Sequence, residues 1–230
     1  MCLWPKVRRL WKGMVINMIN VMIVDDHKMI REGLKRILEF DGEVSVIEEA
    51  DNGQDCLNKL KTTKPDIILL DINMPFMNGI ETLQALKKKR KKYKVLMLTV
   101  HNEIEYLLKA VDIGIDGYLL KDSDSSELKR AITSIYNGEK FIQPSLIPLL
   151  NAKLIARDLD KEKLEKLSNR EIQVLKLVSI GMFNKEIGKK LDISERTVKN
   201  HMSNIFKKIE CIDRTQAAVF AIRNGLVNVN

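Results

Sequence analysis

The sequence contains few cysteines, and their spacing excludes several classes of protein. Only Cys2, Cys56 and Cys211 occur in 230 residues. The number is odd, no two lie close together, and no Cys-x-x-Cys pair is present, which argues against a disulfide framework and against a structural zinc site. This pattern fits a reducing compartment, and we expect the protein to be cytoplasmic.

Long apolar runs are also absent, so the sequence predicts no membrane-spanning helix and no membrane partner. A helix needs about 20 consecutive apolar residues to cross a bilayer. Residues 14–24 are rich in apolar side chains, but two asparagines interrupt the segment and two aspartates follow it. No small-residue cleavage site follows either, which argues against a signal peptide.

Residues 1–17 differ in composition from the rest of the chain. They contain both tryptophans, four basic side chains and no acidic one. We interpret them as an N-terminal extension that is disordered, or that results from a start codon placed too early, with Met18 as the initiator. A basic arm that contacts a membrane surface or nucleic acid is the alternative interpretation.

The basic excess is concentrated toward the C-terminal end, although the formal net charge of the whole chain is +8. Residues 18–160 hold 21 basic and 23 acidic side chains, whereas residues 161–230 hold 14 and 8, a difference of +6. A small basic unit after a near-neutral body suggests an anionic partner, most often nucleic acid. A solvated basic surface is the alternative.

Strand-like and helix-like segments alternate five times between residues 18 and 138. The alternation predicts a doubly wound, five-stranded parallel sheet with helices on both faces. Ser125 or Ser126 is the expected N-cap of the last helix. The predicted strands are the apolar runs at residues 19–24, 44–50, 67–70, 94–99 and 117–120.

The predicted strands end in polar or charged side chains that could act together in one site. Asp25 and Asp26 follow the first strand, Asp71 the third and Lys121 the fifth, while Thr99 ends the fourth. Because the carboxyl ends of parallel strands meet at one edge of a sheet, these side chains would share a cleft. Clustered carboxylates without sulfur ligands favour Mg²⁺. A carboxylate beside Mg²⁺ and a lysine is suited to accept a phosphoryl group.

This constellation resembles the receiver domain of bacterial two-component response regulators, over about residues 19–138. The resemblance implies a flavodoxin-like fold and phosphorylation by a sensor histidine kinase. Many receivers have proline where this chain has Asp122, which leaves the local backbone geometry open. The matching motifs are Asp25-Asp26, Asp-Ile-Asn-Met-Pro-x-Met-Asn-Gly from Asp71, Thr99, and Gly-Tyr-Leu-Leu-Lys at 117–121.

The resemblance also implies a role for each of these residues. In that family the third-strand aspartate accepts the phosphate, so this role falls on Asp71, with Thr99 and Lys121 assisting. Thr99 and Tyr118 would be the switch pair, the hydroxyl moving toward the phosphate and the ring turning inward. The implied Mg²⁺ ligands are Asp26, Asp71, the main-chain carbonyl of Asn73 and, through water, Asp25.

The remaining residues divide into a linker at 139–162 and a four-helix, all-α domain at 163–230. The linker contains an amphipathic stretch, which could be a helix packed on the first domain or a short dimerising helix. In the second domain, Ser168 and Glu171 fit a capping box, and Asn184 is the expected cap of the second helix. The third helix is predicted at 195–209.

This second domain resembles the helix-turn-helix output domain of the NarL/FixJ (LuxR-type) subfamily of response regulators, over about residues 163–228. Its C-terminal sequence is most similar to that of DegU-type regulators. The motifs are Leu167-Ser168-x-Arg170-Glu171, Asn184-Lys185-Glu186-Ile187, Ser194-Glu195-x-Thr197-Val198-Lys199-x-His201 and Arg214-Thr215-Gln216-Ala217.

The third helix has the two faces that a recognition helix needs. One face carries apolar residues for the partner helices, and the other carries side chains that can form hydrogen bonds with base edges in the major groove. We predict that Lys199 and Asn200 read bases, with Ser203 on the same face. Contacts with phosphate are predicted for Lys185, Thr197 and Lys207.

Together these features predict a phosphorylation-controlled transcription factor and not an enzyme. The expected partners are promoter DNA, a histidine kinase and, after phosphorylation, a second copy of the chain; RNA polymerase is a further candidate. One alternative is a helix-turn-helix regulator whose receiver fold is never phosphorylated. Another is a Mg²⁺-dependent phosphohydrolase, although such enzymes usually place an acid where this chain has Asn73. No Gly-x-Gly-x-x-Gly follows the first strand, which disfavours a dinucleotide-binding enzyme.

Overall fold

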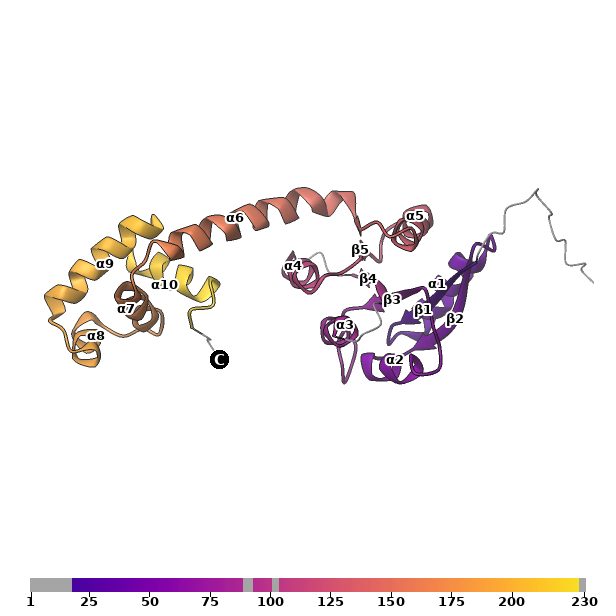
Figure 1. Cartoon of the computed structure of the whole chain (residues 1–230), viewed down its shortest axis with the longest axis horizontal. Helices are drawn as coiled ribbons and strands as arrows, with labels where there is room; N and C mark the ends of the chain where they lie inside the picture. Colours follow the sequence, from indigo (N-terminus) through magenta and orange to yellow (C-terminus); the bar gives the residue numbers. More distant parts are fainter. Residues whose placement is uncertain (1–17, 89–92, 101–103, 228–230) are drawn as a thin grey trace, which may run out of the picture. The chain divides into compact units, whose positions relative to one another are not determined.

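The computed structural model describes residues 18–88, 93–100 and 104–227. These residues form two compact units, with the boundary between Leu150 and Asn151 (Figure 1). The predicted extension at residues 1–17 lies outside the described residues. Among the helices in the described ranges, none is long and apolar enough to cross a membrane.

A parallel sheet forms the centre of the first unit, with the strand order β2-β1-β3-β4-β5-β6. The five predicted strands are all present. A sixth strand of only two residues pairs with β5 and was not predicted, because two residues show no periodicity. The strands are β1 (Ile19–Val24), β2 (Val44–Ala50), β3 (Ile67–Asp71), β4 (Lys94–Thr99), β5 (Gly117–Leu120) and β6 (Phe141–Ile142).

Helices cover both faces of this sheet, as the alternating pattern predicted. Helix α1 packs against α5, whereas α2 contacts α3 and α3 contacts α4, so the two groups lie on opposite faces (Figure 1). All five residues of β3 are buried, which explains its uninterrupted apolar sequence. The helices are α1 (Lys28–Glu39), α2 (Gly53–Lys59), α3 (Gly79–Lys87), α4 (Ile104–Ile113) and α5 (Ser125–Tyr136).

The predicted N-caps of two helices are wrong. Helix α5 is capped by Asp124, whose carboxylate accepts a hydrogen bond of 2.8 Å from the amide of Glu127, and not by Ser125 or Ser126. Helix α8 is capped by Phe183, so Asn184 is its first residue and not its cap. The reason is the carboxylate of Glu186, which accepts the N–H of Phe183 at 2.7 Å and thereby places the start of the helix.

The second unit is all-α and contains the four predicted helices. Helix α6 precedes them and occupies most of the predicted linker, after β6 and a short 3-10 turn at Pro144–Leu146. The apolar faces of the four later helices meet in one core, against which Leu164 of α6 packs. The helices are α6 (Ile147–Glu165), α7 (Asn169–Ser179), α8 (Asn184–Leu191), α9 (Glu195–Ile209) and α10 (Arg214–Arg223).

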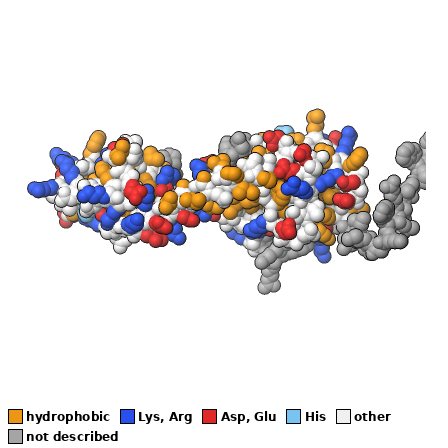
Figure 2. All heavy atoms as spheres, turned by 90° about the horizontal axis from the view of Figure 1, so that it is seen from above, with side chains coloured by type: hydrophobic (Ala, Val, Ile, Leu, Met, Phe, Trp, Pro, Cys, Tyr) orange, Lys and Arg blue, Asp and Glu red, His pale blue; other side chains and the backbone are white. Residues whose placement is uncertain are grey.

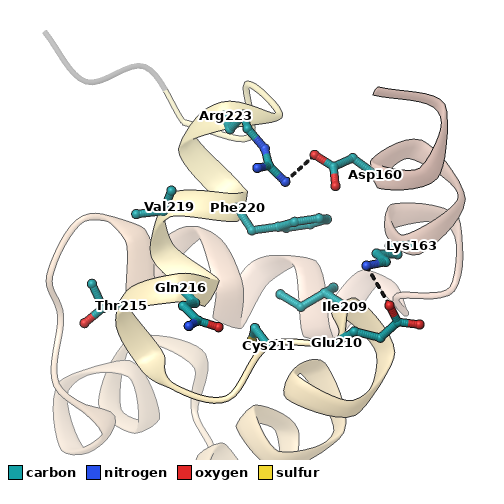
Figure 3. A pocket seen from close by; sticks show the side chains of 10 residues that line it. All are labelled: Asp160, Lys163, Ile209, Glu210, Cys211, Thr215, Gln216, Val219, Phe220 and Arg223. Carbon is teal, nitrogen blue, oxygen red and sulfur yellow. Dashed lines mark ion pairs between the residues drawn. The ribbon is translucent and has the colours of Figure 1, made fainter. Parts of the chain in front are cut away.

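The C-terminal half of α6 is attached to this unit by two ion pairs beside a pocket (Figure 3). The carboxylate of Asp160 forms an ion pair of 2.5 Å with Arg223. It also accepts a hydrogen bond of 3.3 Å from the side-chain amide of Asn224. Lys163 lies 2.8 Å from Glu210 at the end of α9. Helix α6 is therefore part of the C-terminal unit over its last turns.

A sharp turn joins α8 to α9. Asp192 ends α8 in the left-handed conformation, with φ of 55°. A Cβ atom on Gly188 would lie 2.7 Å from the carbonyl oxygen of Ile193, so the turn needs glycine at this position. This close approach sets α9 against α8 in the arrangement of a helix-turn-helix.

Candidate functional site

Three of the predicted site residues meet at the carboxyl edge of the sheet. Asp25 follows β1, Asp71 ends β3 and Lys121 follows β5, and both carboxylates are buried, with 2% and 5% of their surface exposed. The Nζ atom of Lys121 lies 2.6 Å from Oδ2 of Asp25 and 3.0 Å from Oδ1 of Asp71. One ammonium group therefore bridges two carboxylates.

The charge of Asp71 is only partly compensated. Burial raises the pKa of the Asp71 carboxyl above its ordinary value, the ammonium of Lys121 opposes this shift, and the negative charge of Asp25 adds to it. A further positive charge at this edge would stabilise the ionised form. The donors available there are oxygen atoms, which is the chemistry that Mg²⁺ prefers.

The second residue of the acidic pair, Asp26, lies toward solvent and next to His27. The Nδ1 atom of His27 is 2.8 Å from Oδ1 of Asp26 and 3.4 Å from Oδ1 of Asp25. These three side chains form a group whose possible ligand atoms lie within 4.8 Å of one another. His27 was not predicted as a member of this group, although it directly follows the acidic pair in the sequence.

The loop after β3 is held close to Asp71. The amide of Gly79 donates to the carbonyl of Ile72 at 2.8 Å, and a Cβ atom on Gly79 would lie 2.1 Å from the carbonyl oxygen of Asp71. Glycine is therefore required where the loop turns into α3. Asn73 is exposed in this loop, two residues after Asp71, and its role as a carbonyl ligand stays a prediction.

Thr99 and Tyr118 lie on the adjacent strands β4 and β5. Thr99 is fully buried, and its carbonyl accepts a hydrogen bond of 2.7 Å from the N–H of Lys121. Backbone pairing therefore sets the spacing between Thr99 and Lys121. The ring of Tyr118 is also buried, with 1% exposed, and therefore has the inward orientation. The Lys121–Asp122 peptide bond is trans, as are the others in the described ranges.

The predicted DNA-binding residues lie on the exposed side of the helix-turn-helix. Helix α9 buries Val198, Met202, Ile205 and Ile209, as its apolar stripe predicted. Thr197 is half-buried, and its hydroxyl lies 2.8 Å from that of Ser194 within the helix cap. The five other predicted contacts are exposed: Lys185, Lys199, Asn200, Ser203 and Lys207.

Basic side chains are frequent on the surface of this unit, which is the left-hand body in Figure 2. Lys199 forms a surface ion pair of 3.0 Å with Glu195, one turn earlier on the same helix. Such exposed pairs contribute about 0.3–0.5 kcal/mol, so the ammonium can exchange this partner for an acceptor on DNA.

Arg214, the first residue of the motif Arg-Thr-Gln-Ala, has a structural role in this domain that was not predicted. It donates to the carbonyl of Met182 and, at 3.0 Å, to the side chain of Asn184, and so holds the connection between α7 and α8. Asn184 and Arg214 line a hollow together with Lys199 and Ser203 of α9. The start of α8 therefore borders the face on which the predicted base readers lie.

Comparisons with protein families match both units. Residues 21–133 match the response regulator receiver domain, and residues 165–221 match the bacterial regulatory proteins of the luxR family. The chain is 37% identical to the transcriptional regulatory protein DegU of Brevibacillus brevis, over 93% of this chain and 97% of that protein. It is 38% identical to the nitrate/nitrite response regulator protein NarL of Escherichia coli, over 87% and 94%.

Solved structures show the same two-domain architecture. RcsB of Salmonella typhimurium aligns with a TM-score of 0.66 and 26% identity, over 88% of this chain and 98% of that one. A complex of the response regulator RcsB with DNA aligns with a TM-score of 0.58 and 25% identity, over 91% of this chain and 100% of that one. The predicted fold class, an α/β receiver followed by a helical domain, is confirmed.

Proposed function

This chain belongs to the LuxR-type response regulators, and we propose that phosphorylation of Asp71 by a sensor histidine kinase controls DNA binding by its C-terminal domain. The observation that carries the proposal is the bridge of Lys121, 2.6 Å from Asp25 and 3.0 Å from Asp71. The order of a receiver and a LuxR-type domain supports it. So do the relatives, which are named as regulators.

In the proposed reaction, a carboxylate oxygen of Asp71 attacks the phosphorus atom of a phosphohistidine. An O–P bond forms as the N–P bond breaks, and the imidazole of the kinase leaves with the electron pair. Lys121 holds the attacking carboxylate and then binds an oxygen of the transferred group. The hydroxyl of Thr99, at the end of the adjacent strand, donates a hydrogen bond to another of these oxygens.

The site also fits Mg²⁺, because its donors are oxygen atoms and because two buried carboxylates, Asp25 and Asp71, share the single ammonium group of Lys121. When bound, Mg²⁺ neutralises the negative charge of the carboxylates and of the phosphoryl oxygens. Asp26, Asp71 and the main-chain carbonyl of Asn73 would hold the ion, with Asp25 acting through water. Asp25 meanwhile keeps Lys121 in place.

Phosphorylation would act on the second domain through the switch pair. A phosphoryl group at Asp71 recruits the hydroxyl of Thr99 and thereby favours the receiver state in which the ring of Tyr118 is inward, which is the position the ring has in this structure. The domain extents we propose are 18–138 for the receiver, 139–162 for the linker and 163–230 for the DNA-binding domain, preceded by the extension 1–17.

The phosphorylated chain is proposed to bind two half-sites as a homodimer.

On DNA, α9 would enter the major groove, as the second helix of a helix-turn-helix does. Lys199 and Asn200 are then placed to read base edges, with Ser203 beside them. Lys185 and Lys207 contact phosphates on either side. For Thr197 to contact phosphate, its hydroxyl would have to exchange Ser194, 2.8 Å away, for a phosphate oxygen.

The experiment that tests the phosphoacceptor is intact-mass spectrometry after incubation with acetyl phosphate, with and without Mg²⁺. We expect one added phosphoryl group on the wild type, dependent on Mg²⁺, and none on Asp71→Asn. Asp66→Asn, at the opposite end of β3, is the matched control and should be modified like the wild type. Modification of Asp71→Asn, or its absence from the wild type with acetyl phosphate and with a panel of histidine kinases, would refute the proposal.

A further inference from the structure

Phe183 is an exposed aromatic residue at the start of α8, with 74% of its surface accessible. It occupies the N-cap position, where a phenyl ring cannot accept a hydrogen bond from the helix. The N-caps of α2, α3, α5, α7, α9 and α10 are Asn, Asp or Ser residues whose side chains do accept such a bond. Helix α8 therefore lacks a stabilising contact that six other helices have.

The backbone around Phe183 is nevertheless well held. Its N–H donates to the carboxylate of Glu186 at 2.7 Å, which is one half of a capping box. Arg214 binds the residues on both sides, through the carbonyl of Met182 and the side chain of Asn184. These contacts present the ring to solvent, although a hydrophobic core lies within the same domain.

The position of the ring points to its partner. Asn184, the next residue, lines a hollow together with Lys199 and Ser203, which lie on the proposed DNA-reading face of α9. Lys185 follows and is exposed. In a helix-turn-helix the first helix crosses the sugar–phosphate backbone, and here that helix is α8. The ring thus lies where the backbone of DNA would pass.

We infer that Phe183 makes an apolar contact with the DNA backbone, its ring lying against a deoxyribose beside the phosphate that Lys185 binds. An apolar ring next to ammonium groups matches the alternation of apolar sugar and anionic phosphate along a strand. The contact adds affinity without reading sequence. This inference rests on the proposed DNA binding by the C-terminal domain.

The substitution Phe183→Ser tests this inference, because serine at an N-cap stabilises a helix and does not remove a buried side chain. Serine at this position would accept the N–H of Glu186, as Ser168 accepts that of Glu171 at 3.2 Å in α7. In the full-length protein, the thermal midpoint of the C-terminal domain should therefore rise by a few degrees. The Kd for a labelled random-sequence duplex of about 30 base pairs should increase roughly fivefold.

The salt dependence separates an apolar contact from an ionic one. An apolar contact releases no counterions when the protein binds DNA. Its loss in Phe183→Ser should therefore leave the slope of log Kd against log salt unchanged. In Lys185→Ala the slope should fall by about 1, because one phosphate contact is lost. That variant also tests DNA binding itself: if the wild type binds and Lys185→Ala behaves in this way, the proposed function stands whatever Phe183 does.

Ile212→Ser is the matched control for removal of an exposed apolar side chain. Ile212 is 84% exposed in the turn between α9 and α10 and does not line the hollow at the start of α8, so its replacement should leave Kd unchanged. Three results would overturn the inference: an unchanged Kd in Phe183→Ser, an equal loss in Ile212→Ser, or a change of salt slope in Phe183→Ser.

Discussion

The ammonium of Lys121 lies closer to Asp25, at 2.6 Å, than to Asp71, at 3.0 Å. Asp25 therefore anchors the lysine, while Asp71 remains the carboxylate with the weaker compensation. This asymmetry agrees with the raised pKa of Asp71, which burial causes and the charge of Asp25 increases. A buried carboxylate that is costly to ionise in the resting protein is stabilised most by an additional cation beside it.

The first prediction is that Asp71→Asn stabilises the protein near pH 7 in the absence of Mg²⁺, by about 1 kcal/mol. A carboxyl whose pKa is raised on folding favours the folded state below its unfolded pKa, near 3.8, and this contribution is lost as the pH rises through the folded value. Chemical denaturation at several pH values measures the effect. The difference between variant and wild type should vanish below pH 3.8, and a less stable variant at pH 7 would contradict the prediction.

The second prediction concerns the ion pair of Glu171 and Lys208, which joins α7 to α9 at 2.7 Å. Burial alone would raise the pKa of Glu171, but the bonds from Lys208 and Ser168 outweigh it and lower the pKa. The resulting stability is present above the unfolded pKa of 4.5 and is lost as the pH falls through the folded value. Because Lys208 is partly exposed, we expect Glu171→Gln to cost about 1–2 kcal/mol at pH 7.

Glu186→Gln supplies the control for that measurement. Glu186 has the same place in the capping arrangement of α8, but it is exposed. Glutamine keeps an acceptor for the backbone N–H at both positions, so the two variants differ in the burial of the charge that they remove. Equal losses of stability, or a loss in Glu171→Gln that does not diminish at acidic pH, would refute the assigned ion pair.

The third prediction compares two glycines in helices. A Cβ atom on Gly188 would lie 2.7 Å from a backbone carbonyl, whereas nothing lies within 4 Å of one on Gly33 in α1. Gly188→Ala should therefore destabilise the C-terminal unit by roughly 2 kcal/mol or more. Gly33→Ala should stabilise the receiver by about 0.5–1 kcal/mol. Thermal unfolding of both variants measures this, and a shift in the same direction for both would be inconsistent with the packing described.

The fourth prediction concerns the attachment of α6 to α10 (Figure 3). Asp160 is buried and accepts contacts from Arg223 and Asn224, whereas Glu210, the partner of Lys163, is 68% exposed. Asp160→Asn should accelerate amide hydrogen exchange in residues 160–165, by roughly tenfold. Lys163→Ala should change it little, because surface ion pairs contribute about 0–1 kcal/mol. The reverse order of the two effects would show that Asp160 is not the attachment point.

The fifth prediction separates base reading from phosphate binding on α9. Lys199→Ala should reduce the preference for a target promoter over random duplex by roughly tenfold. Lys207→Ala should weaken binding to both duplexes about equally, with a salt slope lower by about 1. Fluorescence anisotropy with the two duplexes measures both. Equal losses on the two duplexes for Lys199→Ala would remove Lys199 from the base readers.

The sequence predicted the strands more reliably than the starts of helices. The run 67–70 suits a strand covered on both faces, because it is short and a proline and an Asn-Gly turn lie on either side of it. At α5, Asp124, Ser125 and Ser126 can each cap a helix, and local chemistry does not distinguish them. At α8 the cap is Phe183, which no capping rule would select. The predicted fold was therefore correct, while two boundaries were wrong.

The site residues were predictable for the same reason. Asp25, Asp71, Thr99 and Lys121 were identified from their positions at strand ends, and the structure places all four at one edge of the sheet. The contacts between these side chains could not be predicted, because rotamers and burial decide them. The engagement of the Thr197 hydroxyl by Ser194, and the support that Arg214 gives to α8, depend on tertiary geometry in the same way.

The backbone ladder between β3, β4 and β5 has a consequence for how this protein tolerates change. Asp71, Thr99 and Lys121 occupy the ends of three adjacent paired strands, so hydrogen bonds of the sheet set the distances among them. Residues inserted into the loops at the opposite edge of the sheet lengthen the chain without moving these ends. One residue inserted within a strand would turn its final side chain to the other face. The loops at the opposite edge can therefore change in length while Asp71, Thr99 and Lys121 stay in register.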